Sequence, residues 1–340
     1  MKKRLILACV TLLLATVGPA LGQTHAFIWD ATNGMRDLGS LGGDSFATAV
    51  NDSGTVVGFY DPADGSYFHG FIWTEATGMV DIGIPGGGNG RFASCQPTAI
   101  NNAGNVVGYG READGFQVAF FWSPSGGFTT LGDLTCRCDN GNVAYAINDN
   151  DEVTGNLKVK NVGDIYHAFL WSPSMTGPRD LGTVAGADYS IGYGINNLAR
   201  IVGGSLANSD LTWQPMVWKK QSGMRLLGIK PDAVYTQATA VNDAGEIVGY
   251  GFTSTETFAF YKAPDTAFEF LQGLGGNETF GFAINQQGVI AGSSYSTAGS
   301  PHAVVWSSAT STPQDITGVG SSAARGINNL GQVVGESPTP

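Results

Sequence analysis

The chain has 340 residues, and only 13% of them are Asp, Glu, Lys or Arg, about half of the usual ~25% in globular domains. Its 28 acidic and 17 basic side chains give a formal net charge of -11 at pH 7, which argues against a nucleic-acid-binding protein. A hydrophobic content of 42% excludes a disordered polyelectrolyte, and 50 Gly with 11% aromatic residues favour an all-β protein with many turns.

The first 22 residues are typical of a secretory signal peptide. Residues 2–4 are basic, residues 5–17 are uncharged and mostly apolar, and Ala20-Leu21-Gly22 supplies the small residues of a cleavage site. As a helix, the apolar stretch is roughly 20 Å long, too short for a ~30 Å hydrocarbon core. We expect cleavage near Gly22-Gln23 and a secreted, extracellular or periplasmic chain without a membrane span; a retained anchor is the alternative.

The remaining residues, 23–340, repeat one unit of about 45 residues seven times, so we expect a single domain. Each unit contains a His-Ala-Phe-Ile-Trp-like element, a Met-x-Asp-Leu-Gly-like element, an Ala-Ile-Asn element and a Val-Val-Gly element. The units start near positions 25, 69, 118, 167, 214, 258 and 302. The Asn of the third element stands at positions 51, 101, 148, 196, 242, 285 and 328.

The four elements of each unit predict four short strands. The first and fourth are rich in β-branched and aromatic residues, and the third alternates with a period of two. Turns such as Asn51-Asp52-Ser53-Gly54 join the third strand to the fourth, and where Ala199 replaces the Gly we expect mild strain. Four antiparallel strands in ~45 residues indicate a propeller blade. We therefore predict an all-β fold, a seven-bladed β-propeller built from seven ~45-residue four-stranded repeats.

The third strand carries the smallest residues, as the crowded centre of a propeller requires. We therefore expect the third, fourth, first and second strands to run outward from the axis in that order. The N-terminal hairpin, 25–39, then shares a blade with residues 321–335 and closes the ring. A blade in plain chain order is the alternative, and an open solenoid is disfavoured because the end units carry no polar caps.

The recurring His-Ala-Phe-x-Trp, Asp-Leu-Gly, Ala-Ile-Asn and Gly-x-Val-Val-Gly elements resemble the HAF family of bacterial extracellular repeats over residues 25–335. The resemblance implies export from a bacterium and a β fold built from repeats. It brings no established activity with it.

The four His residues occupy one repeat position, which indicates a structural role rather than a catalytic one. They are His25, His69, His167 and His302, and we expect Asp37, Asp81, Asp180 and Asp315 of the second strand to bond within their own blades. No further His remains for a nucleophilic triad or a zinc site. We expect no catalytic residue, no cofactor and no metal.

Three cysteines follow the expected cleavage site. Cys95 lies in the long loop before the third strand of the second unit, and Cys136 and Cys138 lie in the same loop of the third unit. Adjacent blades place these loops side by side, and export permits disulfides. We predict that Cys95 bonds Cys136 or Cys138.

Variable loops on a rigid scaffold commonly carry function. In an antiparallel blade, the loops before the first and third strands share one face, and we expect a ligand there. The candidate residues are Trp213, Tyr67, Phe92, Tyr109, Phe116, Tyr166, Phe252, Asp64 and Asp210. We expect a non-catalytic binding or adhesion module for an extracellular glycan or protein. The alternatives are a cell-envelope or matrix scaffold and, less favoured, an extracellular polysaccharide-active enzyme with paired acids.

Overall fold

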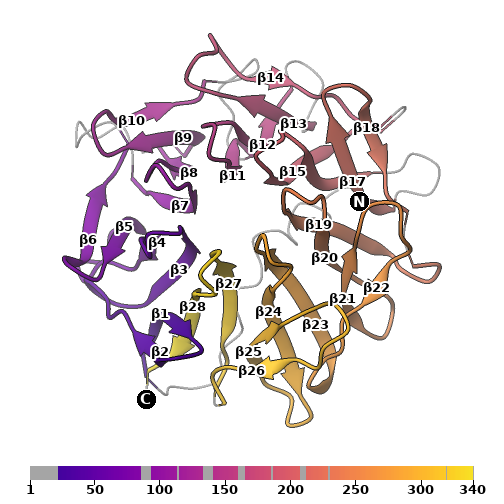
Figure 1. The fold of residues 1–340 in the computed structure, drawn as a ribbon. Coiled ribbons are helices and arrows are strands. Elements are labelled where there is room, and N and C mark those ends of the chain that lie inside the picture. The colour runs from indigo at the N-terminus through magenta and orange to yellow at the C-terminus, as the bar shows by residue number, and fades with distance from the viewer. Residues whose placement is uncertain are drawn as a thin grey trace.

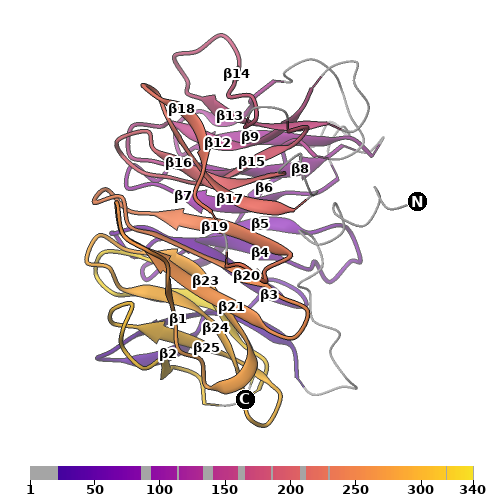
Figure 2. The same cartoon turned by 90° about the vertical axis from the view of Figure 1, so that its right-hand side faces the viewer.

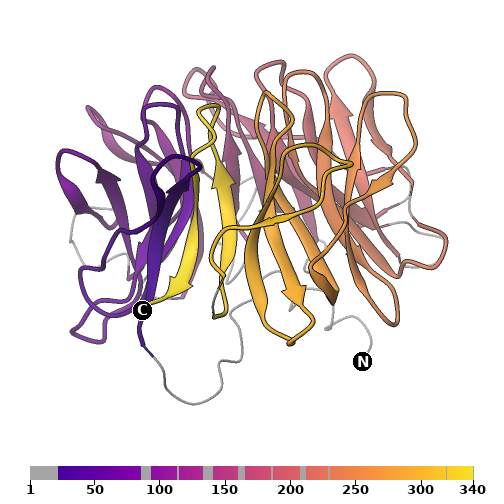
Figure 3. The same cartoon turned by 60° about the horizontal axis from the view of Figure 1, so that its bottom comes forward.

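The computed structural model describes residues 22–85, 93–112, 115–132, 141–159, 165–184, 187–206, 212–228, 230–318 and 320–339. Within these ranges the regular structure is β-strand throughout and contains no helix, which confirms the all-β prediction. The strands form sheets that stand around a central axis (Figure 1). Figures 2 and 3 show the same ring from the side and obliquely, with loops emerging on its two faces.

Four sheets contain four strands each. In hydrogen-bonded order from the axis outward, they are β3 (Ser45–Val50), β4 (Val56–Tyr60), β5 (His69–Thr74), β6 (Gly78–Gly83); β7 (Gln96–Ile100), β8 (Val106–Arg111), β9 (Gln117–Ser123), β10 (Gly127–Thr130); β11 (Val143–Ile147), β12 (Val153–Lys158), β13 (Tyr166–Trp171), β14 (Arg179–Asp180); and β27 (Ala323–Ile327), β28 (Val333–Pro338), β1 (Thr24–Asp30), β2 (Gly34–Asp37).

The fifth sheet contains twelve strands in three sets of four. They are β15 (Ser190–Ile195), β16 (Ile201–Leu206), β17 (Trp213–Lys219), β18 (Gly223–Leu226); β19 (Tyr235–Val241), β20 (Ile247–Phe252), β21 (Thr257–Lys262), β22 (Glu269–Phe270); and β23 (Gly275–Ile284), β24 (Ile290–Ser296), β25 (Pro301–Trp306), β26 (Gln314–Asp315). A single parallel pair joins each set to the next, Trp213 with Tyr235 and Thr257 with Glu278.

The strand order within each set is the one that the small residues of the third strand predict. The innermost strands of neighbouring sets contact one another around the ring. Their approach is close, because a Cβ atom added to Gly326 of β27 would lie 3.1 Å from the Cα of Ala49 in β3. The set that contains both ends of the chain joins β1 to β28, with Thr24 opposite Pro338 and Trp29 opposite Val333. The N-terminal hairpin therefore shares a sheet with the C-terminal strands, as predicted.

The repeated Asn residues at the ends of the innermost strands form a circle of hydrogen bonds. Each side-chain Nδ2 donates to the backbone carbonyl of the next Asn at 2.8–3.1 Å, and the last bond runs from Asn328 back to Asn51. Each Oδ1 accepts the backbone N–H of the residue four positions later, such as Arg200 for Asn196. One buried side chain thus closes its own turn and binds the neighbouring set.

The turns that these Asn residues begin require a positive φ at their fourth position. Gly supplies it in most copies, and Asp151 and Ala199 adopt φ values of 58° and 54°. The strain expected at Ala199 is therefore present, since Ala has a Cβ that disfavours this region.

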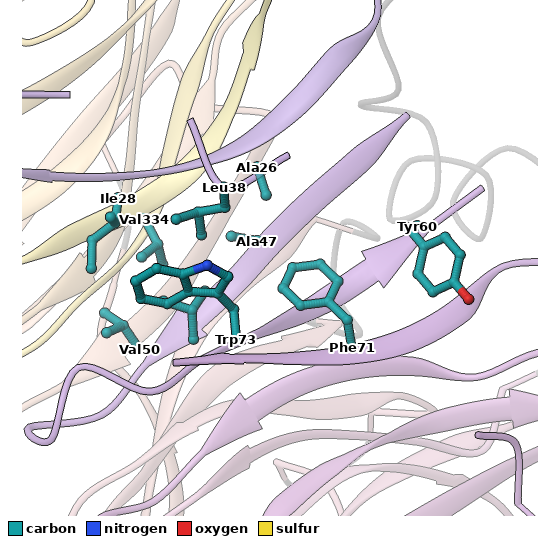
Figure 4. Close-up of a cluster of buried hydrophobic side chains, with 10 residues drawn as sticks. Ala26, Ile28, Leu38, Ala47, Val50, Tyr60, Phe71, Trp73 and Val334 are labelled. Carbon is teal, nitrogen blue, oxygen red and sulfur yellow. The ribbon is translucent and has the colours of Figure 1, made fainter. Parts of the chain in front are cut away.

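The hydrophobic core lies between adjacent sheets. Figure 4 shows Trp73 and Phe71 of β5 against Ile28 of β1 and Val334 of β28, with Leu38 beside them. Because apolar burial contributes about 25 cal/mol per Å², this buried layer of side chains stabilises the packing of neighbouring sheets.

Candidate functional site

The first and second strands of four sets are linked by a His–Asp pair. The Nδ1 atom lies 2.6–3.0 Å from the carboxylate in the pairs His25–Asp37, His69–Asp81, His167–Asp180 and His302–Asp315. Each Asp also accepts a backbone N–H, from Gly39, Gly83, Gly182 and Gly318. These pairs join strands inside one set, as the sequence predicts for a structural role.

The His–Asp pairs also shift the acidity of their carboxyls. Burial raises the pKa of Asp81, Asp180 and Asp315, but hydrogen bonds from the paired His and from backbone N–H groups outweigh it, so that each pKa lies below its usual value. The carboxylates are consequently held in their charged form.

One set replaces this polar pair with two aromatic rings. Phe258 of β21 stands at the repeat position of the His, and Phe270 of β22 stands at that of the Asp. Their rings meet edge to face with centroids 5.4 Å apart. Phe258 is buried, whereas Phe270 is 48% exposed. The break in the repeat therefore exposes an aromatic surface where other sets have a hydrogen-bonded pair.

A pocket of about 340 Å³ lies beside this aromatic pair, and we call it the loop-face pocket. It is lined by Lys230, Glu256, Thr257, Phe258, Phe270, Leu271, Gly273, Gly275, Gly276, Asn277 and Thr279. These residues come from the segments before β19, before β21 and before β23, together with the adjoining strand ends. The pocket thus lies on the face for which the sequence predicts a ligand.

One wall of the pocket exists because β23 is longer than the other innermost strands. It has ten residues, Gly275–Ile284, and its added N-terminal part runs beside β21, where Glu278 pairs with Thr257. This part of β23 packs closely against β24 and requires Gly, since a Cβ atom on Gly276 would lie 2.6 Å from the carbonyl oxygen of Tyr295. A second departure from the repeat therefore coincides with the aromatic pair.

The charges that line the pocket are paired. Lys230 Nζ lies 2.5 Å from Glu256 Oε1, 3.4 Å from the exposed Asp232 carboxylate and 5.2 Å from the centre of the Phe258 ring. The hydrogen bond with Glu256 is the main cause that raises the pKa of Lys230. The ammonium group is therefore charged at neutral pH and fixed over the aromatic pair.

The sequence-predicted ligand residues do not form one patch. Tyr67 is 63% exposed and Asp64 is exposed, in the segment between β4 and β5. Tyr109, Phe116 and Phe252 are half-buried. Phe92 and Asp210 lie outside the described residues.

The candidate ligand residue Trp213 is buried. It is 5% exposed and packs against Leu206 and Ile191, with its ring stacked 6.1 Å from that of Tyr235. Tyr166, at 3% exposure, is buried in the same way at the start of β13. Each of these residues begins the first strand of its unit, β17 and β13, where the side chain covers the edge of the core rather than facing solvent.

Cys95 is buried and bonds no other cysteine among the described residues, and burial raises the pKa of its thiol. Cys136 and Cys138 lie outside the described residues. The disulfide therefore stays a prediction.

A second cavity, of about 200 Å³, lies at the mouth of the Asn circle. Its rim consists of the residues that follow each Asn, namely Asp52, Asn102, Asp149, Asn197, Asp243, Gln286 and Asn329. Each of them donates its backbone N–H to the side chain of the next at 2.8–2.9 Å. The rim is thus a second closed circle, and the repeat accounts for it as structure.

Within the described ranges, no group of three or more His, Cys, Asp or Glu side chains is placed to hold a metal ion. No helix long and apolar enough to cross a membrane occurs in that part of the chain.

The aromatic pair was missed at the sequence level, although a signal for it existed. Aligning the units places Phe258 and Phe270 at the His and Asp positions. Two other units also lack both polar partners, with Val118 and Thr130 in one and Gln214 and Leu226 in the other. The signal for the pair is therefore that aromatic residues replace both partners in the same unit.

Comparisons with known proteins give a family and a fold. A family model described as "Protein of unknown function (DUF3466)" matches residues 24–280. No curated protein matches the chain. The β-propeller domain of the Trilobed protease from Pyrococcus furiosus is similar in structure, with a TM-score of 0.53 and 10% identity over 84% of this chain and 88% of that one.

Putative TolB from Agrobacterium tumefaciens is also similar, with a TM-score of 0.52 and 10% identity over 94% of this chain and all of that one. At these identities the likeness shows the β-propeller fold alone. The Pyrococcus domain is described as having an open velcro topology, whereas here β1 pairs with β28.

Proposed function

Because the chain belongs to the family described as "Protein of unknown function (DUF3466)", which assigns it no activity, we propose a function from its own site: it is a non-catalytic binding module for an extracellular glycan or protein. The observation that carries this proposal is the loop-face pocket. It combines an exposed aromatic ring with a few convergent polar groups, the usual composition of a ligand site.

The two departures from the repeat support the same conclusion. In four other sets the residues at these positions form a His–Asp pair that joins two strands, whereas Phe270 leaves apolar surface in water at a cost in solvation. Such surface is typical of a binding site when polar groups surround it.

The architecture we propose is a seven-bladed propeller with four strands in each blade. The seven hydrogen bonds of the Asn circle support that number, since each joins one four-stranded set to the next and the last returns to the first. Such a ring gives the loops a rigid support, which suits a binding module.

We further propose that the protein is exported, as a member of the HAF repeat proteins that its motifs resemble. The predicted cleavage point near Gly22-Gln23 supports this, because β1 begins directly after it at Thr24. Gln23 itself accepts a hydrogen bond from the backbone N–H of Thr339. Cleavage there leaves every described strand intact.

The test is a binding screen of residues 23–340 on an array of bacterial and plant glycans and on an array of extracellular and cell-envelope proteins. We expect saturable binding to members of one array. Saturable binding to neither contradicts a binding module, and release of reducing ends from a bound glycan contradicts a non-catalytic role.

A further inference from the structure

We infer that the loop-face pocket takes a neutral saccharide, stacked on Phe270. The inference rests on the proposed function and names the ligand class of the same site. Its starting point is the aromatic pair, because the ring of Phe270 is 48% exposed and packs at an interplanar angle of 87° against the buried ring of Phe258. The C–H face of a sugar ring carries partial positive charge, which matches the negative face of an aromatic ring.

The charges of the pocket select against a charged ligand. Among the described residues that line it, Lys230 and Glu256 are the ionisable ones, and they already form an ion pair. An anionic sugar would have to take Lys230 from Glu256 or lie against that carboxylate unpaired, and either arrangement is unfavourable. The acidic balance of the whole chain, -11, also opposes an anion.

The polar groups of the pocket match hydroxyl groups. The Glu256 carboxylate is an acceptor, the Lys230 ammonium is a donor, and the Asn277 amide and Thr257 hydroxyl are both. A sugar hydroxyl also donates and accepts, so neighbouring hydroxyls of one ring satisfy such a mixed set. An apolar ligand would displace water from the Asn277 amide and the Thr257 hydroxyl without replacing its hydrogen bonds, at a cost in affinity.

The size of the pocket sets the length of the ligand. Its volume of about 340 Å³ lies near the lower end of the ~300–1,000 Å³ range of small-molecule pockets. One or two sugar units therefore fill it, which indicates recognition of a chain end or a short oligosaccharide.

The repeat itself supplies a fold-preserving test. The double variant Phe258→His with Phe270→Asp rebuilds the pair that four other sets contain and removes the aromatic face. Phe270→Leu keeps the apolar character but lacks the ring, and Tyr67→Ala removes an exposed aromatic residue elsewhere on the same face as a matched control. Thermal unfolding of each variant checks that it folds.

The measurement is isothermal titration calorimetry with a panel of neutral methyl hexopyranosides and disaccharides, beside the matching hexuronic acids and hexosamines. We expect at least one neutral sugar to bind, and to bind at least tenfold more weakly to the double variant and to Phe270→Leu. Tyr67→Ala should bind as the natural chain does.

Three results overturn the inference. The first is tighter binding of a uronic acid or hexosamine than of every neutral sugar. The second is neutral-sugar binding that the double variant retains in full. The third is that no neutral sugar binds, while a protein from the array screen binds the natural chain and not the double variant. This result is compatible with the proposed binding module. Absence of any ligand in both experiments rejects the inference and the proposed function together.

Discussion

At the scale of single residues, one repeat position carries two kinds of chemistry. His167 and Asp180 join two strands, and Phe258 and Phe270 at the equivalent positions form the edge of a pocket. The Asn of each unit shows the opposite behaviour, because all seven copies make the same bonds. The Asn that the ring needs keeps its identity in every unit, whereas the aromatic replacement of the His–Asp pair lies beside the loop-face pocket.

Asn196→Ala should destabilise the protein by about 2–4 kcal/mol, since it leaves buried backbone groups without partners. The side chain is 3% exposed, donates to the Asn242 carbonyl and accepts from Leu198 and Arg200. Urea unfolding measures the loss, and Leu198→Ala in the same turn is the control, because its side chain is 70% exposed. Equal stability of the two variants would contradict the structural role of the circle.

Asp180→Asn should lower stability at neutral pH by about 1 kcal/mol, a modest value because the carboxylate is partly exposed. The pKa of Asp180 is lower in the folded chain than its ordinary value of 3.8. The stabilisation that the charged Asp180 carboxylate contributes is therefore complete above pH 3.8. It is lost as the pH falls through the lower pKa of the folded chain. Unfolding free energies of both proteins should converge in acid, and a difference that persists there would argue against this origin.

The sulfur of Cys95 should not react with an aromatic disulfide reagent in the folded protein, because it is buried, and burial also raises the pKa of a free thiol there. Thiol titration of residues 23–340, unfolded but not reduced, then tests the predicted disulfide with Cys136 or Cys138. One free thiol supports it, and three rule it out.

At the scale of elements, the sequence predicts the strands, their order and their turns, because a short motif encodes each of them. Val56-Val57-Gly58 is an example: a Cβ on Gly58 would lie 2.0 Å from the carbonyl oxygen of Phe46, so the strand needs Gly there. The burial of Trp213 did not follow, since it depends on stacking against Tyr235 of the next set. The extension of β23 depends likewise on pairing with β21, which no local pattern encodes.

Deletion of residues 24–37 removes β1 and β2 and exposes the edge of β28. We expect aggregation and a large drop in the unfolding temperature, because an unpaired strand edge binds other chains. Size-exclusion chromatography and calorimetry measure both effects. A monomeric truncated chain with an unchanged unfolding temperature would show that the shared sheet contributes little.

At the scale of the whole molecule, a ring of similar units supports the loops, and the loop-face pocket lies at two irregularities of the repeat, the aromatic pair and the extended β23. The propeller fold, shown by the structural neighbours, was predictable because each unit repeats the motifs of all four strands. The sequence predicted the face of the ring on which the loop-face pocket lies, but not the pocket itself. Its walls come from three separate segments, and its ion pair joins Lys230 to Glu256, which is 26 positions away.

The central claim is that a neutral saccharide binds in the loop-face pocket. Hydrogen–deuterium exchange of residues 23–340, with and without a neutral saccharide from the titration panel, tests it most directly. The account predicts slower exchange in residues 256–279 on binding, with no change in residues 61–68 around Tyr67. Protection confined to the turns of the Asn circle, or to residues 61–68, would contradict it and assign the ligand to another surface of the ring.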